Sequence, residues 1–156
     1  MIKPSDLIGK PAPIFNAPAN GNKNLSLDKY KGKKIILYFY PKDMTPACTT
    51  QAKSFACLHK EFTNNDCIII GVSKDSPEKH DKFINKYDIP FDLISDDENS
   101  SICKSYGVWK PKKFMGKEFL GIVRSTFIIN KKGIVIDAIS PVKVENHAEL
   151  ILEKIK

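Results

Sequence analysis

Short apolar runs rich in β-branched and aromatic residues alternate along this chain with stretches of helical composition, and this alternation limits the folds open to it. The expected strands are Lys34–Tyr40, Asp66–Ser73, Phe91–Ser95, Ser125–Asn130 and Ile134–Ile139. The expected helices are Thr45–Thr63, Pro77–Tyr87, Asn99–Tyr106 and Glu145–Ile155. Strands that alternate with helices predict βαβ units. We therefore expect an α/β fold, with a mixed, mostly parallel central sheet and helices on both faces.

Two turn signals refine this prediction. The segment Lys131-Lys-Gly133 joins the last two expected strands and predicts a hairpin, which makes the sheet mixed. Asn20-Gly-Asn22 is an earlier turn signal, so residues Pro11–Asn24 are expected to be irregular or a hairpin.

The length and composition favour one domain over residues 1–156. A chain of 156 residues with 42% hydrophobic content is long enough to bury one substantial core. The first residues contain no apolar signal-peptide core, and no run approaches the roughly 18 apolar residues of a membrane span. We therefore expect a cytoplasmic protein that is neither exported nor inserted in a membrane.

The net charge of +7 comes from basic residues scattered singly and in pairs, with acidic residues between them. Such a pattern indicates a solvated surface and not a nucleic-acid interface. Arg124 is the only arginine among the 25 basic residues. It stands at the start of an apolar strand. This position favours a specific role, which needs a planar, permanently charged, bidentate group, over an incidental surface arginine.

Four cysteines occur at positions 48, 57, 67 and 103, without a Cys-x-x-Cys pair. This spacing disfavours a thioredoxin-type dithiol and a zinc ribbon. Cys48 has the most informative context, because Thr45 is a preferred N-cap residue and Pro46 suits the first helical position. Cys48 is then the third residue of a helix, where free backbone N–H groups and the helix dipole favour a thiolate. It is the candidate nucleophile.

These residues resemble the peroxiredoxins. The motif Pro41-x-x-x-Thr45-x-x-Cys48, followed by a distant strand arginine, Arg124, is the active-site signature of that family. Further blocks are similar to the peroxiredoxin Q branch, also called bacterioferritin comigratory protein: Tyr38-Phe-Tyr-Pro-Lys, Cys48-Thr-Thr-Gln-Ala52, Tyr106-Gly-Val-Trp109, Phe114-Met-Gly-Lys117 and Gly121-Ile-Val-Arg124. The resemblance implies a thioredoxin-like fold and a peroxide substrate. It also implies that Cys48 attacks the O–O bond and becomes a sulfenic acid.

Physical roles for the other motif residues are consistent with this resemblance. Arg124 and the N–H groups of the helix start would stabilise negative charge on the leaving oxygen. The Thr45 hydroxyl can both accept and donate a hydrogen bond, and would hold the peroxide in line with the sulfur. Pro41 would shield the thiolate from water. The simpler alternatives are that Thr45 only caps the helix and that Pro41 only ends a strand.

The chain departs from the family at the second thiol. Many members of the branch carry a resolving cysteine five residues after the nucleophile, where this chain has Lys53. Cys57 lies one helical turn further on the same outward face. It is a candidate resolving thiol, and the alternative is a single-cysteine peroxidase resolved by an external thiol. Cys103 is a second candidate, for which a packing role is favoured, and Cys67 is expected in the core.

The sequence thus predicts a thiol-dependent peroxidase for hydrogen peroxide and organic hydroperoxides, recycled by thioredoxin or a similar thiol donor. A peroxide-sensing switch or a chaperone-like binding protein on the same scaffold is the alternative. No cofactor is implied. The histidines at positions 59, 80 and 147 lack the spacing of a metal site and are expected on the surface or on helices. By resemblance to its branch, the protein is expected to be a monomer.

Overall fold

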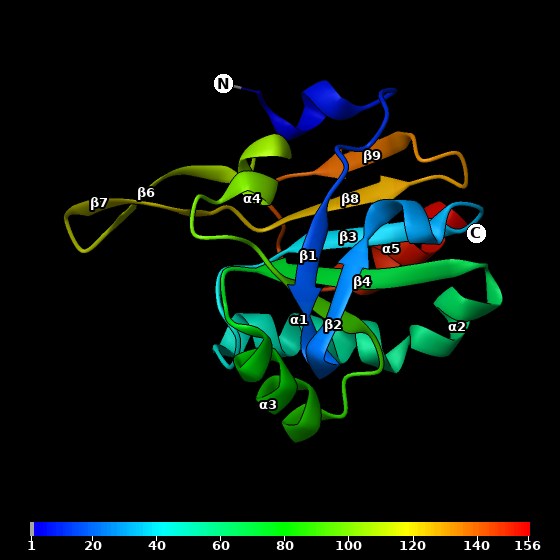
Figure 1. Ribbon diagram of the computed structural model, residues 1–156, viewed down its shortest axis with the longest axis horizontal. Helices are drawn as coiled ribbons and strands as arrows, with labels where there is room; N and C mark the ends of the chain where they lie inside the picture. Colours follow the sequence, from blue (N-terminus) through cyan, green and yellow to red (C-terminus); the bar gives the residue numbers. More distant parts are fainter. Residues whose placement is uncertain (1) are drawn as a thin grey trace.

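Seven strands form the central sheet in the order β2-β1-β5-β4-β3-β8-β9, in a computed structural model that describes residues 2–156 (Figure 1). The strands are β1 (Asn16–Ala19), β2 (Lys23–Ser26), β3 (Lys34–Phe39), β4 (Cys67–Ser73), β5 (Asp92–Ser95), β8 (Ser125–Ile129) and β9 (Val135–Ile139). Strands β6 (Trp109–Phe114) and β7 (Lys117–Ile122) form a separate antiparallel pair. All five strands expected from the sequence are present, each within one residue of its predicted bounds.

The sheet is mixed, as predicted. Strand β4 pairs in parallel with both β3 and β5 at the centre of the sheet. The other four pairings are antiparallel, because a hairpin is added at each side of these three strands, so the expectation of a mostly parallel sheet is wrong. The predicted hairpin of the last two strands is confirmed as β8–β9. The N-terminal region contains a second hairpin, β1–β2, whose strands are joined by the turn Asn20–Asn22.

The helices are α1 (Pro46–Cys57), α2 (His59–Asn64), α3 (Pro77–Tyr87), α4 (Ser101–Ser105) and α5 (His147–Ile155), with short 3-10 turns η1 (Pro4–Leu7), η2 (Asn20–Asn22) and η3 (Leu27–Tyr30). The bounds predicted for α3 are correct, and those of α4 and α5 differ by one or two residues. The prediction of one continuous helix over Thr45–Thr63 is wrong. The helix is interrupted at Leu58, whose ψ of 4° ends α1 before α2 begins. No proline or glycine marks this break, so the sequence carried no signal for it.

Both faces of the sheet are covered, because side chains of β3 alternate between two apolar clusters. Ile35, Leu37 and Phe39 belong to a cluster that includes the N-terminal segment and α4. Ile36 and Tyr38 belong to the opposite cluster, with side chains of α1, α2, α3 and α5. The predicted arrangement of helices on both faces is therefore confirmed.

The β6–β7 hairpin was not predicted. It projects away from the sheet (Figure 1) and exposes its turn, where Phe114 and Met115 are 67% and 87% accessible. Most residues along both strands are exposed or only half-buried. Because no face of the hairpin is fully buried, its sequence lacks the clean apolar and polar alternation that identifies a strand.

The topology brings two distant segments to one edge of the sheet. Strands β3 and β8 are antiparallel, and Phe39 at the end of β3 lies opposite Ser125 at the start of β8. The segment after β3 leads into α1, and Arg124 directly precedes β8. The helix start with Cys48 and the chain's only arginine therefore meet at this edge.

Candidate active site

The candidate active site is built on the first turn of α1. Thr45 is the N-cap residue with an extended backbone, and Pro46 is the first helical residue, as predicted. Cys48 is therefore the third residue of the helix. The N–H of Thr49 closes the first turn by donating to the Thr45 carbonyl, at 2.9 Å. The Thr45 hydroxyl does not cap the helix and donates instead to the carbonyl of Lys42, at 2.8 Å.

Cys48 and Arg124 are in direct contact. The Arg124 guanidinium donates from Nη2 to the Cys48 sulfur at 3.3 Å and from Nη1 to Oε1 of Gln51 at 2.7 Å. Cys48 is only 2% exposed, so little water competes for the sulfur. The sulfur thus has a fixed cation and the positive end of the helix dipole beside it. The arrangement is suited to a nucleophilic sulfur with a hydrogen-bond donor beside it.

Gln51 is a site residue that the sequence analysis missed. It is 1% exposed and holds the second nitrogen of the Arg124 fork. Its position three residues after Cys48 places both side chains on one face of α1. A polar residue on the buried face of a helix was the available signal.

The backbone of Arg124 is also fixed. Its carbonyl accepts a hydrogen bond from the N–H of Val142 at 2.9 Å, which connects the start of β8 to the segment before α5. Pro41 is half-buried, lies two residues after the end of β3 and opens the loop that leads to Thr45. The four residues of the predicted motif therefore lie on two segments that meet at one end of β3 and β8.

Comparison with known proteins identifies the family. The family model of AhpC/TSA matches residues 8–138 of this chain. The chain belongs to this peroxiredoxin family.

Individual relatives agree with this assignment. The chain is 48% identical to peroxiredoxin Bcp of Bacillus subtilis over 149 residues, which cover 96% of this chain and 94% of that protein. It is 36% identical to peroxiredoxin Bcp of Escherichia coli over 148 residues, which cover 95% and 94% of the two proteins. Two structures from Xanthomonas campestris, a peroxiredoxin Q and a bacterioferritin comigratory protein, are each similar with a TM-score of 0.85. Each is 38% identical, and the match covers 90% of this chain and 89% of the other.

These relatives confirm the predicted resemblance to the peroxiredoxin Q branch, the thioredoxin-like fold and the peroxidase activity. This peroxiredoxin is a thiol-dependent peroxidase: it acts on peroxides and is reduced by thiol donors.

The other three thiols differ sharply in accessibility. Cys57 is exposed at the end of α1, nine positions after Cys48, which is about 13 Å along the helix axis. Cys67 is buried, and burial raises the pKa of its thiol to about 12. Cys103 is fully buried on α4, where burial and then Asp96 raise its thiol pKa well above the usual range. Cys103 also belongs to the apolar cluster on the face of the sheet opposite Cys48.

Two of the three histidines are buried. All three lie on helices, as the sequence analysis allowed, but His80 and His147 are buried. The Nε2 atom of His147 is 2.8 Å from the Thr126 hydroxyl on β8. Burial lowers the pKa of His147 to about 4, and the nearby Arg124 cation acts in the same direction. His147 is therefore neutral near pH 7 and adds no charge to the site.

Lys112 of β6 reaches toward the same site and donates to the Ile122 carbonyl at 2.8 Å. Partial burial lowers the pKa of Lys112, and the charge of Arg124 lowers it further.

Within residues 2–156 no group of three or more His, Cys, Asp or Glu side chains has the arrangement of a metal site. No helix in the same range is long and apolar enough to cross a membrane.

Proposed function

We propose that Cys48 is the peroxidatic residue of this peroxiredoxin, acting on hydrogen peroxide and organic hydroperoxides. Its thiolate attacks one peroxide oxygen, the S–O bond forms as the O–O bond breaks, and the second oxygen leaves as water or an alcohol after it gains a proton. The sulfur becomes a sulfenic acid. The contact of Arg124 with the buried Cys48 sulfur, at 3.3 Å, is the strongest support for this proposal. Alkyl peroxide reduction activity is described for the Xanthomonas campestris bacterioferritin comigratory protein, which supports organic hydroperoxides as substrates.

Arg124 is proposed to act on the leaving oxygen as well as on the sulfur. Negative charge moves from sulfur to oxygen during the reaction, and donors already in place stabilise it without reorganisation. The Arg124 fork is held by Gln51, so its remaining N–H groups keep a fixed direction. The free N–H groups of the first turn of α1 add further donors.

Thr45 and Pro41 are proposed to position and shield the peroxide. The Thr45 hydroxyl donates to Lys42, which leaves its oxygen lone pairs available to accept from a peroxide O–H. Pro41 contributes a rigid apolar ring at the start of the same loop, which would exclude water from the thiolate.

We propose thioredoxin or a similar dithiol protein as the reductant. Cys57 remains the candidate resolving thiol, because it is exposed on the same helix, but about 13 Å of helix must unwind before it reaches Cys48. Cys103 is the weaker candidate, because it is buried in the opposite cluster. A Cys57→Ser variant that still forms an intramolecular disulfide with one equivalent of peroxide, seen by mass spectrometry, would exclude Cys57. A free sulfenic acid in the unaltered protein would instead indicate resolution by an external thiol.

The experiment that tests the peroxidase assignment is stopped-flow consumption of peroxide with thioredoxin and its reductase. We expect catalytic turnover that is lost in Cys48→Ser and retained in Cys67→Ser, a matched control at a buried thiol. Turnover that survives Cys48→Ser would contradict the assignment. One equivalent of oxidation without turnover would indicate a redox switch.

We also propose that residues 1–156 act as one monomeric domain in the cytoplasm. The exposed free thiol of Cys57 fits a reducing compartment. Size-exclusion chromatography with light scattering at several concentrations tests the monomer directly.

A further inference from the structure

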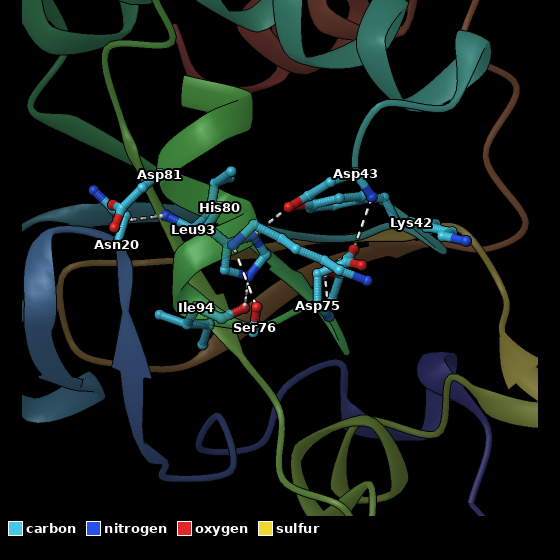
Figure 2. A network of polar contacts seen from close by, with 12 residues as sticks. Asn20, Lys42, Asp43, Asp75, Ser76, His80, Asp81, Leu93 and Ile94 are labelled. Atoms are coloured by element: carbon cyan, nitrogen blue, oxygen red, sulfur yellow. Dashed lines mark hydrogen bonds and ion pairs between the residues drawn. The ribbon is translucent and has the colours of Figure 1, made fainter. Parts of the chain in front are cut away.

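A buried polar network surrounds Asp43, which lies in the loop between β3 and α1 (Figure 2). One oxygen of the Asp43 carboxylate accepts from the Tyr40 hydroxyl at 2.6 Å. The other oxygen is 2.7 Å from Nδ1 of His80, which comes from α3. Asp43 is 5% exposed and His80 is fully buried. None of these three side chains is one of the four named residues of the active-site motif, although Tyr40 lies in one of the peroxiredoxin Q blocks.

The partners of His80 fix the orientation of its ring. Its Nε2 atom is 3.1 Å from the carbonyl of Ile94, and a carbonyl can only accept, so Nε2 donates this hydrogen bond. Its Nδ1 atom is held by the Asp43 carboxyl group, whose other oxygen accepts from Tyr40. Both ring nitrogens therefore have a hydrogen-bond partner, as buried polar groups require.

Asp43 is also held through its backbone. Its N–H donates to the carboxylate of Asp75 at 2.7 Å, and that carboxylate accepts from the Ser73 hydroxyl at 2.9 Å. Ser73 ends β4, and Asp75 lies two residues later. Residue 43 is therefore fixed at its side chain by α3 and at its backbone by the segment after β4.

The helix that carries His80 is itself anchored at two places. The Ser76 hydroxyl caps its first turn by accepting from the N–H of Lys79 at 3.3 Å. One turn later, Asp81 accepts from the N–H of Gly21 at 2.7 Å, which connects α3 to the turn between β1 and β2. Asn20 of that turn accepts from the N–H of Leu93 on β5 (Figure 2). His80 consequently has a defined position relative to the sheet.

The loop held by this network has an unfavourable backbone conformation. Met44 adopts a left-handed conformation with φ of 70°, which costs a residue with a side chain about 1 kcal/mol. Such a conformation persists only where the surrounding contacts over-determine it. Asp43 directly precedes Met44, and Thr45 directly follows it. The contacts of Asp43 thus act on the residue that turns the chain into the N-cap of α1.

We propose that His80 and Asp43 are a positioning pair for the peroxidase reaction. They hold the loop Pro41–Pro46 in the conformation that places the Thr45 hydroxyl and the start of α1 around the peroxide, without contacting the peroxide themselves. This inference rests on the proposed roles of Cys48 and Thr45. Its consequence is specific: loss of the pair impairs reactions that need an aligned substrate more than reactions that need only a thiolate.

The test compares two reactions of the Cys48 sulfur in a His80→Gln variant. The first is its oxidation by hydrogen peroxide, followed by stopped flow. The second is its alkylation by iodoacetamide, measured by mass spectrometry of the Cys48 peptide. Alkylation needs the thiolate but no aligned peroxide. We expect the rate constant with peroxide to fall roughly ten- to hundredfold, as misplacement of a positioning group does, while the alkylation rate changes less than about twofold.

A matched control is Ile84→Ala, which removes half-buried apolar volume from the same helix without touching the network. It lowers stability but should leave both rate constants unchanged. Tyr40→Phe is a second variant, which removes one donor to Asp43 and keeps the ring; we expect the same selective loss, smaller than in His80→Gln. The Tyr40→Phe variant keeps the proposal testable if the His80→Gln variant does not fold.

Three results would overturn the positioning pair: an unchanged peroxide rate constant in the folded variants, an equal loss of both reactions, or the same loss in Ile84→Ala. These results differ from a failure of the proposed function. In that case the unaltered protein itself would show no Cys48-dependent reaction with peroxide.

Discussion

The contacts of Arg124 explain why a chain that otherwise uses only lysine contains one arginine. One nitrogen of its planar fork reaches Cys48 and another reaches Gln51. A lysine ammonium has no fixed fork and cannot hold both directions at once. We predict that Arg124→Lys lowers kcat/KM for peroxide by about a hundredfold, the effect of losing one preorganised donor to a developing oxyanion. Stopped-flow oxidation of the reduced protein measures this.

The control for that variant is Lys143→Arg, which makes the reverse exchange at an exposed position. Its kcat/KM should equal that of the unaltered protein. An Arg124→Lys variant that reacts within threefold of the unaltered protein would show that only the positive charge matters, and not the fork.

His147 makes stability depend on pH in a defined window. Its imidazole binds a proton near pH 6.5 in the unfolded chain but only near pH 4 in the folded protein. Between these values the unfolded chain holds more protons, so the free energy of unfolding falls as the pH is lowered from 6.5 to 4. The slope from this one group is at most about 1.4 kcal/mol per pH unit.

Urea unfolding at pH 7, 6 and 5 measures this dependence. We predict that His147→Gln, which keeps a polar group near Thr126, has a flatter profile than the unaltered protein. His59→Gln is the matched control, because His59 is only half-buried at the start of α2. Parallel profiles for the unaltered protein and His147→Gln would contradict the prediction.

Single residues were predictable where local signals identified them. The N-cap Thr45 and the first-turn Pro46 placed Cys48 at a helix start before any fold was known. The contact of Arg124 with Cys48 was not visible locally and came from the family resemblance. The His80–Asp43 pair had no signal at all, because the two residues lie 37 positions apart and meet only through the packing of α3 on the face of the sheet that also carries α1.

At the scale of elements, prediction succeeded where apolar periodicity and end signals coincided. Helix α3 was predicted with its correct bounds, because Ser76 and Pro77 mark its start and an apolar face continues to Tyr87. The β6–β7 hairpin was missed, because its exposed strands bury no complete face. The break at Leu58 was missed because no helix-breaking residue stands there.

The tip of this hairpin allows a prediction about association. Phe114 and Met115 are 67% and 87% exposed, so replacing them removes little buried area. We predict that the double variant Phe114→Ser/Met115→Ser changes the free energy of unfolding by less than about 0.5 kcal/mol, as is usual for surface positions. Its tendency to self-associate at high concentration should fall, because the exposed apolar patch is smaller.

Light scattering and urea unfolding on the same samples check both parts. Lys110→Ser/Lys113→Ser is a control on the same hairpin that keeps the apolar tip. A large loss of stability in the apolar variant would show that the tip packs against the rest of the molecule. Equal changes in association for both variants would exclude the apolar patch as the cause.

The whole molecule consists of one sheet with an apolar cluster on each face. Alternate residues of β3 contribute to both clusters, so neither can be lost without exposing side chains of the same strand. The candidate active site lies at the end of this shared strand. Its geometry therefore depends on both clusters, although Cys48 belongs to only one of them.

Two buried thiols report on the two clusters separately. Cys67 lies in the cluster with α1, α2, α3 and α5, and Cys103 lies in the opposite cluster. Burial raises the pKa of both thiols, so we expect neither to react with an alkylating agent in the folded protein. In a Cys48→Ser/Cys57→Ser background, we predict that both become reactive only through unfolding of the whole molecule. The logarithm of each alkylation rate should then rise with urea concentration along the same slope, because the slope reflects the surface exposed on opening.

Peptide-resolved mass spectrometry measures the two rates in one sample. The control is the Cys48→Ser variant, in which the exposed Cys57 is present and shows the rate of an unprotected thiol. A shallower slope for Cys103 would mean that α4 and the N-terminal segment open on their own, and that the two faces of the sheet are not one cooperative unit.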